Sequence, residues 1–155
     1  MDLEIRPATV ADLPQVLALC ALLNASDEPS LSMAAATARF IELTAREGHI
    51  VYVAESQGEI VGTFALIFLG GLAHTARDSA IVEDVAVAAN RQGSGIGRQM
   101  MAFAMRQCAL RDCYKLVLSS HLRRDAAHRF YDGMGFRKHG YSFLIDAATA
   151  QQQLA

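Results

Sequence analysis

A glycine-rich turn between two apolar segments constrains this chain more than any other feature of its sequence. An apolar, β-branched segment ends at Val87, and the turn after it contains Gln92, Gly93, Gly95 and Gly97. Apolar residues then recur at helical spacing. The pattern predicts a strand, a tight loop and a helix N-terminus. Such an end has unpaired N–H groups and roughly +0.5 of a charge, which suit a phosphate or pyrophosphate.

Two common phosphate-binding motifs do not fit this turn. A nucleotide P-loop has Lys and then Ser or Thr directly after its last glycine, whereas Gly97 is followed by Arg98 and Gln99. A dinucleotide fingerprint that begins at Gly93 and Gly95 has its third glycine at the position that Arg98 occupies. The alternative without a ligand is an ordinary connection between a strand and a helix.

Composition is typical of a globular chain. Of the 155 residues, 52% are hydrophobic and 19% are charged, which provides for a substantial core and excludes the disordered class. We expect residues 1–147 to form a single domain and residues 148–155 to form a tail. The net charge of −2 predicts no nucleic-acid partner, because it offers no electrostatic footprint for a polyanion.

Cysteine usage and hydropathy bear on the compartment. Cys20, Cys108 and Cys113 lie in apolar patterns without a metal-ligand spacing, so we expect reduced thiols in the core and no bound metal. No apolar stretch approaches the ~18 residues of a membrane span, and no leader pattern opens the chain. We therefore expect a cytoplasmic protein with no membrane partner.

Short patterns ahead of the glycine-rich turn predict further elements. Asp12 and Gln15 have the spacing of a capping box at the start of one helix, and Ser32 is a candidate N-cap for a second helix. Runs of β-branched and aromatic residues predict three strands, at Leu3–Arg6, Ile50–Ala54 and Ile60–Phe68. The last two flank a turn that contains a glycine, and this indicates a hairpin.

The turn and the segments around it resemble the acetyl-coenzyme A loop of the GNAT N-acetyltransferase superfamily. The Gln-x-x-Gly-x-Gly pattern of Gln92–Gly97 follows an acidic strand at Glu83–Val87. A Phe-Tyr pair at 130–131 and a Gly-Phe pair at 135–136 then follow in the order of the GNAT core. The resemblance covers roughly residues 49–146.

The resemblance implies an α+β fold, an α/β sandwich whose mixed, mostly antiparallel sheet has six or seven strands and about four flanking helices. The expected order is β-α-α-β-β-β-α-β-α-β-β. The strands at Ile81–Val87 and Lys115–Ser119 are expected to diverge, with acetyl-coenzyme A in the opening. The residues implied to bind its pantetheine and pyrophosphate are Val85, Ala86, Val87, Gln92, Gly93, Ser94, Gly95, Ile96, Gly97 and Arg98.

Two residues are candidates for the chemistry of acetyl transfer to an amine. An alkylamine has a pKa near ~10.4, so at pH 7 only about one molecule in two to three thousand is nucleophilic. Glu83 is the candidate general base, and strand alternation predicts the opposite sheet face for Asp84. Tyr131 resembles the family tyrosine that protonates the departing thiolate. The alternatives are a salt bridge or a solvated position for Glu83 and a packed ring for Tyr131.

The sequence leaves the acceptor amine open. The segment at 124–131 resembles aminoalkylphosphonate N-acetyltransferases, and those at 83–87 and 113–115 resemble glucosamine-6-phosphate N-acetyltransferases. The leading class is therefore a small amine with a phosphorus oxyanion. A protein or peptide amine is the second hypothesis, and a non-catalytic domain that senses acetyl-coenzyme A is the third. We also expect a homodimer.

Basic residues and histidines gather between residues 121 and 139. They could hold an acidic acceptor or the 3′-phosphate of the coenzyme, or they could form a solvated basic face. His121, Asp125 and His128 could also meet on one side of a helix, which leaves a metal site as the minor alternative.

Overall fold

The computed structural model describes residues 2–23, 31–145 and 149. Contacts group the chain into two compact units, Met1–Leu118 and Ser119–Ala155. A single domain over residues 1–147 stays a prediction, and the predicted tail lies outside the described residues except for Thr149. Within the described part of the chain, no helix is both long enough and apolar enough to cross a membrane.

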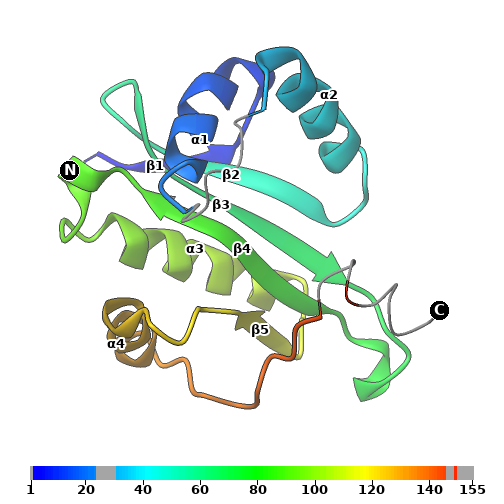
Figure 1. The fold of residues 1–155 in the computed structure, drawn as a ribbon. Helices are drawn as coiled ribbons and strands as arrows, with labels where there is room; N and C mark the ends of the chain where they lie inside the picture. Colours follow the sequence, from blue (N-terminus) through cyan, green and yellow to red (C-terminus); the bar gives the residue numbers. More distant parts are fainter. Residues whose placement is uncertain (1, 24–30, 146–148, 150–155) are drawn as a thin grey trace. The chain divides into compact units, whose positions relative to one another are not determined.

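The first unit contains a five-stranded sheet in the order β1-β2-β3-β4-β5 (Figure 1). Neighbouring strands are antiparallel from β1 to β4, whereas β4 and β5 are parallel. The strands are β1 (Glu4–Pro7), β2 (His49–Ser56), β3 (Glu59–Leu69), β4 (Ser79–Val87) and β5 (Lys115–Leu118). A parallel pair needs a crossover, and helix α3 (Ile96–Leu110) supplies it between β4 and β5.

The predicted hairpin between β2 and β3 is confirmed. Ser56 pairs with Glu59, so Gln57 and Gly58 form a two-residue turn. Both turn residues have positive φ, 55° for Gln57 and 79° for Gly58, which is the type I′ geometry that matches the twist of a hairpin.

Helices cover both faces of the sheet (Figure 1). Helices α1 (Leu13–Cys20) and α2 (Met33–Thr44) pack on one face, and α3 packs on the other. The side-chain oxygen of Ser32 accepts a hydrogen bond from the N–H of Ala35 at 3.3 Å, so the predicted N-cap of α2 is confirmed. Together with α4 (Asp125–Gly133) in the second unit, the predicted four helices are present.

The two faces have different cores. On the α1 face, Val16 packs in one cluster with Val53 of β2 and Ala86 of β4. On the α3 face, the rings of Tyr52 and Phe64 stack with centroids 5.2 Å apart. The cross-strand partner of a residue therefore indicates which face of the sheet it lies on, because paired residues share a face.

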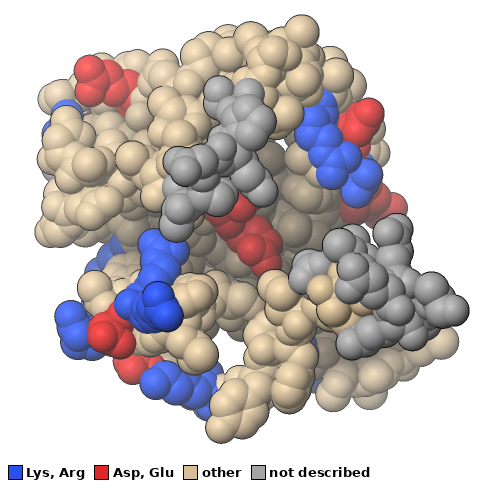
Figure 2. All heavy atoms as spheres, in the orientation of Figure 1, with Lys and Arg blue, Asp and Glu red and all other residues tan. Residues whose placement is uncertain are grey.

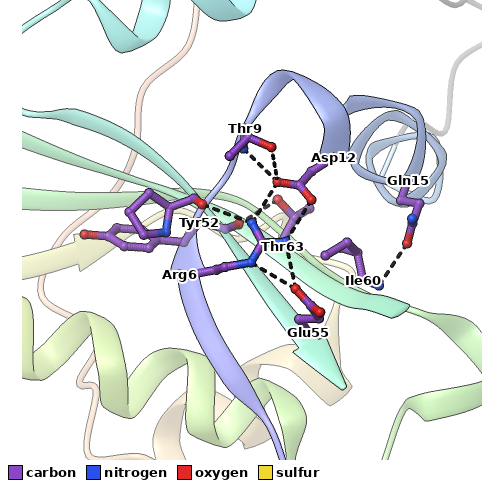
Figure 3. Close-up of polar contacts among 9 residues, drawn as sticks. Arg6, Thr9, Asp12, Gln15, Tyr52, Glu55, Ile60 and Thr63 are labelled. Carbon is purple, nitrogen blue, oxygen red and sulfur yellow. Dashed lines mark hydrogen bonds and ion pairs between the residues drawn. The ribbon is translucent and has the colours of Figure 1, made fainter. Parts of the chain in front are cut away.

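A charged cluster holds β1, β2 and the start of α1 together (Figure 3). The Arg6 guanidinium donates to Asp12 at 2.8 and 2.9 Å and to Glu55 at 2.7 and 2.9 Å. The Asp12 carboxylate also accepts from the backbone N–H of Thr9 at 2.7 Å and from its hydroxyl at 2.9 Å. Mainly through the Arg6 hydrogen bonds, the pKa of Asp12 lies well below its ordinary value and that of Arg6 well above.

The predicted capping box of Asp12 and Gln15 is wrong. Asp12 does occupy the N-cap position of α1, but its carboxylate turns back to Thr9 and Arg6 instead of capping the helix. Gln15 is used elsewhere, because its side-chain oxygen accepts a hydrogen bond from the N–H of Ile60 at 2.8 Å (Figure 3). Asp12 therefore bonds to residues that precede it, and Gln15 bonds to a residue that is distant in the sequence.

The second unit contains helix α4 (Asp125–Gly133). The described residues after it, 134–145, contain no strand. The two strands predicted there are therefore not found, and the sheet has five strands instead of six or seven among the described residues. A strand is stable only when a neighbour pairs its N–H and C=O groups, and no described strand pairs with this segment.

Candidate active site

The site begins at a bulge in the middle of β4. Glu83 pairs with Ala65 of β3, but the next paired residue, Ala86, lies opposite Thr63. Two residues of β4, Asp84 and Val85, therefore stand opposite one residue of β3. Asp84 has a left-handed backbone with φ of 53°, which few residues other than glycine adopt readily.

Just before this bulge, β4 reaches the end of its pairing with β5. The parallel pairing runs from Ser79 opposite Lys115 to Val82 opposite Leu118, and β5 ends there. Residues 83–87 therefore extend β4 past the end of β5. The divergence of the two strands stays a prediction, because β5 is paired along its whole length.

The glycine-rich turn follows directly. The backbone of Gly93 has φ of 78° and that of Gly95 has φ of 89°, so both positions require a residue that tolerates left-handed geometry. A Cβ atom added at either glycine would meet no atom within 4 Å, so the space beside both glycines is open. The Gln92 side chain donates to the carbonyl of Val87 at 3.3 Å and ties the turn to the end of β4.

Helix α3 starts at this turn with an uncapped end. Its N-cap is Gly95, which has no side chain to accept a hydrogen bond, and the first intrahelical bond runs from the N–H of Gln99 to the carbonyl of Gly95. The N–H groups of Ile96 and Gly97 precede that bond and are oriented toward the turn. Ile96 and Met100 are buried against the sheet, which keeps this end in place.

Glu83 presents a carboxylate on the part of β4 that extends past β5. The residue as a whole is exposed, but protein atoms around the carboxylate displace part of its water, and it forms no ion pair with a described residue. Partial burial raises the pKa of Glu83 above its ordinary value, and the negative charge of Asp84 raises it further. A raised pKa makes a carboxylate a stronger base near neutral pH.

Strand alternation does not hold at Asp84. Because of the bulge, Glu83 and Ala86 pair with residues two apart on β3, although they are three apart on β4. The prediction that the Glu83 and Asp84 side chains lie on opposite faces of the sheet assumed regular alternation, and the bulge interrupts that alternation here. The negative charge of Asp84 also acts on two other groups. The pKa of Cys20 is raised mainly by burial and further by Asp84. The pKa of His49 is lowered, and Asp84 opposes that lowering.

His49 is a neighbour that the sequence analysis missed. Burial lowers its pKa first, and the positive charges of Arg46 and Arg39 lower it further. No motif marks this residue, because it enters the neighbourhood of Asp84 only through the pairing of β2, β3 and β4. The bulge was missed too, although an aspartate inside a strand is a weak signal for a left-handed residue.

Tyr131 lies on α4 in the second unit. Its ring contacts Phe130 and Phe136 edge-on, with centroids 5.2 and 5.7 Å apart. Burial raises the pKa of its phenol, and the nearby Arg124 opposes that shift, so the hydroxyl is protonated at neutral pH and can donate. The other predicted site residues, Glu83, Val85–Val87 and Gln92–Arg98, all lie together in the first unit.

The predicted metal alternative gains no support from the described residues. No group of three or more His, Cys, Asp or Glu side chains among them is arranged to hold an ion. His121 instead accepts a hydrogen bond on Nδ1 from the N–H of Arg123 at 3.2 Å, which is a local turn contact. The three cysteines, Cys20, Cys108 and Cys113, are free thiols, as expected.

Strand β4, the glycine-rich turn and the start of α3 all lie within a segment that matches a known family. Residues 47–138 match the family model described as an acetyltransferase (GNAT) domain. This chain belongs to the GNAT acetyltransferase family. Its membership of this family, together with the names of its relatives, identifies the protein as an N-acetyltransferase.

Three relatives show how far the likeness to this GNAT acetyltransferase extends. Glucosamine 6-phosphate N-acetyltransferase of Trypanosoma brucei brucei is 28% identical over 148 residues, 94% of this chain and 97% of the relative. A solved structure from Agrobacterium tumefaciens str. C58, provisionally assigned as an acetyltransferase, is 32% identical with a TM-score of 0.87 over 92% of this chain and 99% of that one. Glucosamine-6-phosphate N-acetyltransferase from Arabidopsis thaliana has a TM-score of 0.81 at 20% identity, over 95% and 99%, and shares the fold.

Proposed function

We propose that this enzyme transfers the acetyl group of acetyl-coenzyme A directly to the primary amine of a small molecule that carries a phosphorus oxyanion. The observation that carries the proposal is the glycine-rich turn, with open space beside Gly93 and Gly95, at the uncapped start of α3. N–H groups on such a turn are what a pyrophosphate needs, and the part of β4 that extends past β5 offers backbone groups to an amide-containing pantetheine.

The residues present fit the coenzyme. The space beside Gly93 and Gly95 is open, so a phosphate oxygen can approach their backbone. In our proposal the N–H groups of Gln92–Arg98 hold the pyrophosphate, and Val85–Val87 pair with the pantetheine amides as a neighbouring strand would. The bound coenzyme supplies the acetyl thioester.

Glu83 is proposed to take the proton from the acceptor amine. The scarcity of neutral amine at pH 7 corresponds to roughly 4–5 kcal/mol, so a positioned base has a large deficit to offset. Partial burial and the charge of Asp84 raise the pKa of Glu83 toward the working pH, where such a base is most effective.

Tyr131 is proposed to give its proton to the sulfur atom of the departing coenzyme thiolate. Its phenol stays protonated at neutral pH because burial raises its pKa. A phenol and a thiolate of similar basicity can share a proton with little energetic penalty. The assignment of this role rests on the resemblance of the Phe-Tyr pair to the family motif.

One observation favours a small anionic acceptor. The Trypanosoma relative, which aligns with 94% of this chain, is named for an amino sugar phosphate. The face drawn in Figure 2 shows both basic and acidic side chains, so the choice of acceptor rests on that relative.

We further propose that the enzyme is a cytoplasmic homodimer. Its three free cysteines suit a reducing compartment. Exposed apolar side chains near the C-terminus, from Tyr141 to Ile145, suit a partner chain.

The test is release of coenzyme thiol in the presence of matched pairs of amines. Glucosamine 6-phosphate is compared with glucosamine, an aminoalkylphosphonate with the alkylamine of equal length, and both with peptides that carry a free N-terminus. We expect kcat/KM to be at least about tenfold higher for each phosphorus-bearing member, since one charge-assisted hydrogen bond is worth about that much. Equal rates within each pair, or a preference for peptides, would reject the anionic acceptor. No thiol release with any amine would reject the transferase activity.

A further inference from the structure

Helix α3 ends in a turn that brings two cysteines together. The N–H of Cys113 donates to the carbonyl of Cys108 at 3.0 Å, and the N–H of Asp112 donates to the carbonyl of Ala109 at 3.1 Å. Asp112 has a left-handed backbone with φ of 51°. Two such bonds around a left-handed residue form a Schellman motif, in which the side chains of the two outer residues frequently meet. Here both outer residues are cysteines.

The two sulfur atoms lie within reach of each other. The Cys108 and Cys113 thiols share a side-chain hydrogen bond, and the Cys108 sulfur also lies 3.6 Å from the carbonyl oxygen of Lys115, where β5 begins. A disulfide joins residues whose Cα atoms are about 4.4–6.8 Å apart. With the covalent bonds on either side, the 3.0 Å backbone hydrogen bond separates the two Cα atoms by about 7 Å at full stretch, and by less in a bent turn. The backbone therefore already holds the pair at a separation that a disulfide can bridge.

The two thiols differ in their access to solvent. Cys108 is 6% exposed, whereas Cys113 is half-buried. Burial first, and then the hydrogen bond with Cys113, raise the pKa of Cys108 to about 12. Because the thiolate is the reactive form of a cysteine, an oxidant in solution reacts first with Cys113, and Cys108 reacts second.

We propose that Cys108 and Cys113 are a site of reversible oxidation, at which a low-molecular-weight disulfide converts the two thiols into a bridge within the chain. The bridge ties the C-terminal end of α3 to the segment that leads into β5. Both cysteines belong to the first unit, and the glycine-rich turn lies at the other end of α3, about 20 Å away. The inference is therefore independent of the proposed acetyl transfer.

The oxidation takes place in two exchange steps, written here with oxidised glutathione as the low-molecular-weight disulfide. The Cys113 sulfur attacks one sulfur of oxidised glutathione, so a mixed disulfide forms and the first glutathione leaves as a thiol with the proton of Cys113. The Cys108 sulfur then attacks the Cys113 sulfur, and the second glutathione leaves with the proton of Cys108. Two protein thiols are oxidised, and one disulfide is reduced to two thiols. Excess glutathione reverses both steps.

The first test is a peptide map of the full-length protein after incubation with oxidised glutathione and alkylation of the remaining thiols. Trypsin cleaves after Arg106, Arg111 and Lys115, so it separates the two cysteines onto peptides 107–111 and 112–115. We expect these peptides to be joined until a reductant is added, in protein that migrates as a single chain of 16.8 kDa on a non-reducing gel. Alkylation of both cysteines after oxidation, or joined peptides found only in a covalent dimer, would overturn the inference.

Serine variants separate the roles of the three cysteines. Cys20→Ser is the matched control and should form the same bridge, because Cys20 lies on α1, outside the motif. Cys108→Ser should keep one glutathione on Cys113, since the thiol that would displace it is gone. Cys113→Ser should take up no glutathione at the buried Cys108. Loss of the bridge in Cys20→Ser, or joined peptides that contain Cys20, would contradict the assignment.

Thermal unfolding provides a measurement on the unmodified sequence. A bridge between residues 108 and 113 restricts the unfolded chain, so oxidised wild type should melt about 5 °C above the reduced protein. Circular dichroism measures both forms, and Cys20→Ser should show the same rise. A lower melting temperature in the bridged form would mean that the turn has to distort to close the bridge, and the site would be rejected.

Discussion

Two parts of one sheet treat charged side chains in opposite ways. At the β1–β2 edge, Arg6, Asp12 and Glu55 form a closed cluster in which each carboxylate accepts hydrogen bonds from the guanidinium (Figure 3). On β4, Glu83 and Asp84 lie side by side with no ion pair to a described residue. The pKa of Asp12 is lowered, whereas the pKa of Glu83 is raised.

The difference separates charges that stabilise the fold from charges that are available for chemistry. A carboxylate with all its hydrogen bonds made within the protein gains stability and has nothing left for a ligand. A carboxylate whose neighbours are a second acid and partly apolar surroundings costs stability and is ready to take a proton. The direction of the pKa shift distinguishes the two kinds.

The strongest way to break this contrast is to close the open end of α3 with a carboxylate. Gly95→Asp adds a negative charge where we expect the pyrophosphate, and like charges in contact cost several kcal/mol. We expect acetyl-coenzyme A to bind at least about 100-fold more weakly in calorimetry. Gly95→Asn is the control, since asparagine has a similar shape and tolerance of left-handed φ but no charge. Wild-type affinity in the aspartate variant would refute the assignment of the loop.

The contrast is sharpened by separating the two proposed catalytic roles. Tyr131→Phe should lower kcat by about 10²–10⁴-fold with little change in coenzyme affinity, because it removes only a proton donor. In Glu83→Gln, kcat should fall most at low pH and recover in part as pH rises, because a larger fraction of the amine is then already neutral in solution. We would measure kcat against pH for both. If both variants kept rates within about threefold of wild type and the same pH profile, neither residue would take part, and positioning alone would remain as the source of catalysis.

The closed cluster makes the complementary prediction about stability. Asp12→Ala removes a buried acceptor of charged hydrogen bonds, so we expect a loss of about 2–3 kcal/mol in the free energy of unfolding at pH 7. Glu83→Gln should change that free energy by less than about 0.5 kcal/mol. Urea unfolding followed by circular dichroism measures both. Equal losses of unfolding free energy would mean that Asp12 and Glu83 contribute equally to stability, which contradicts the contrast drawn above.

The pH dependence of that stability has a definite sign. Because the pKa of Asp12 is lower in the folded protein, its contribution is complete above the ordinary aspartate pKa of about 3.9 and is lost as pH falls below that value. Wild type should therefore lose more stability than Asp12→Ala between about pH 5 and pH 2.

The smallest predicted effect concerns the neighbour of Glu83. Asp84→Asn removes a negative charge that raises the pKa of Glu83, so the acid limb of kcat/KM should move to lower pH. Asparagine also tolerates the left-handed backbone, so the bulge should persist. Asp112→Asn is the control, because Asp112 has φ of 51° but lies in the turn before β5. An unshifted profile in Asp84→Asn would show that the titrating base is not Glu83.

Local patterns predicted the turn and hairpin because their information is short-range. Glycines at 93 and 95 have the positive φ that their positions need, and the two-residue turn at Gln57 and Gly58 closes the hairpin as expected. The predicted capping box at Asp12 failed because its carboxylate bonds to residues before it. It accepts from the N–H of Thr9 and from the Arg6 guanidinium, and this charged donor is stronger than a helix N–H.

The sequence by itself determined the strand, turn and helix around residues 85–98, the hairpin, the order of the elements as far as α4, and through them the membership of the GNAT family. Backbone conformation there follows from which residues tolerate a given φ and from apolar periodicity, and both are properties of neighbours in the chain. Only the tertiary structure decided that Asp84 forms a bulge, that His49 lies near Asp84, and that β4 extends past the end of β5. These depend on pairing between residues far apart in sequence, whose energies no local pattern records.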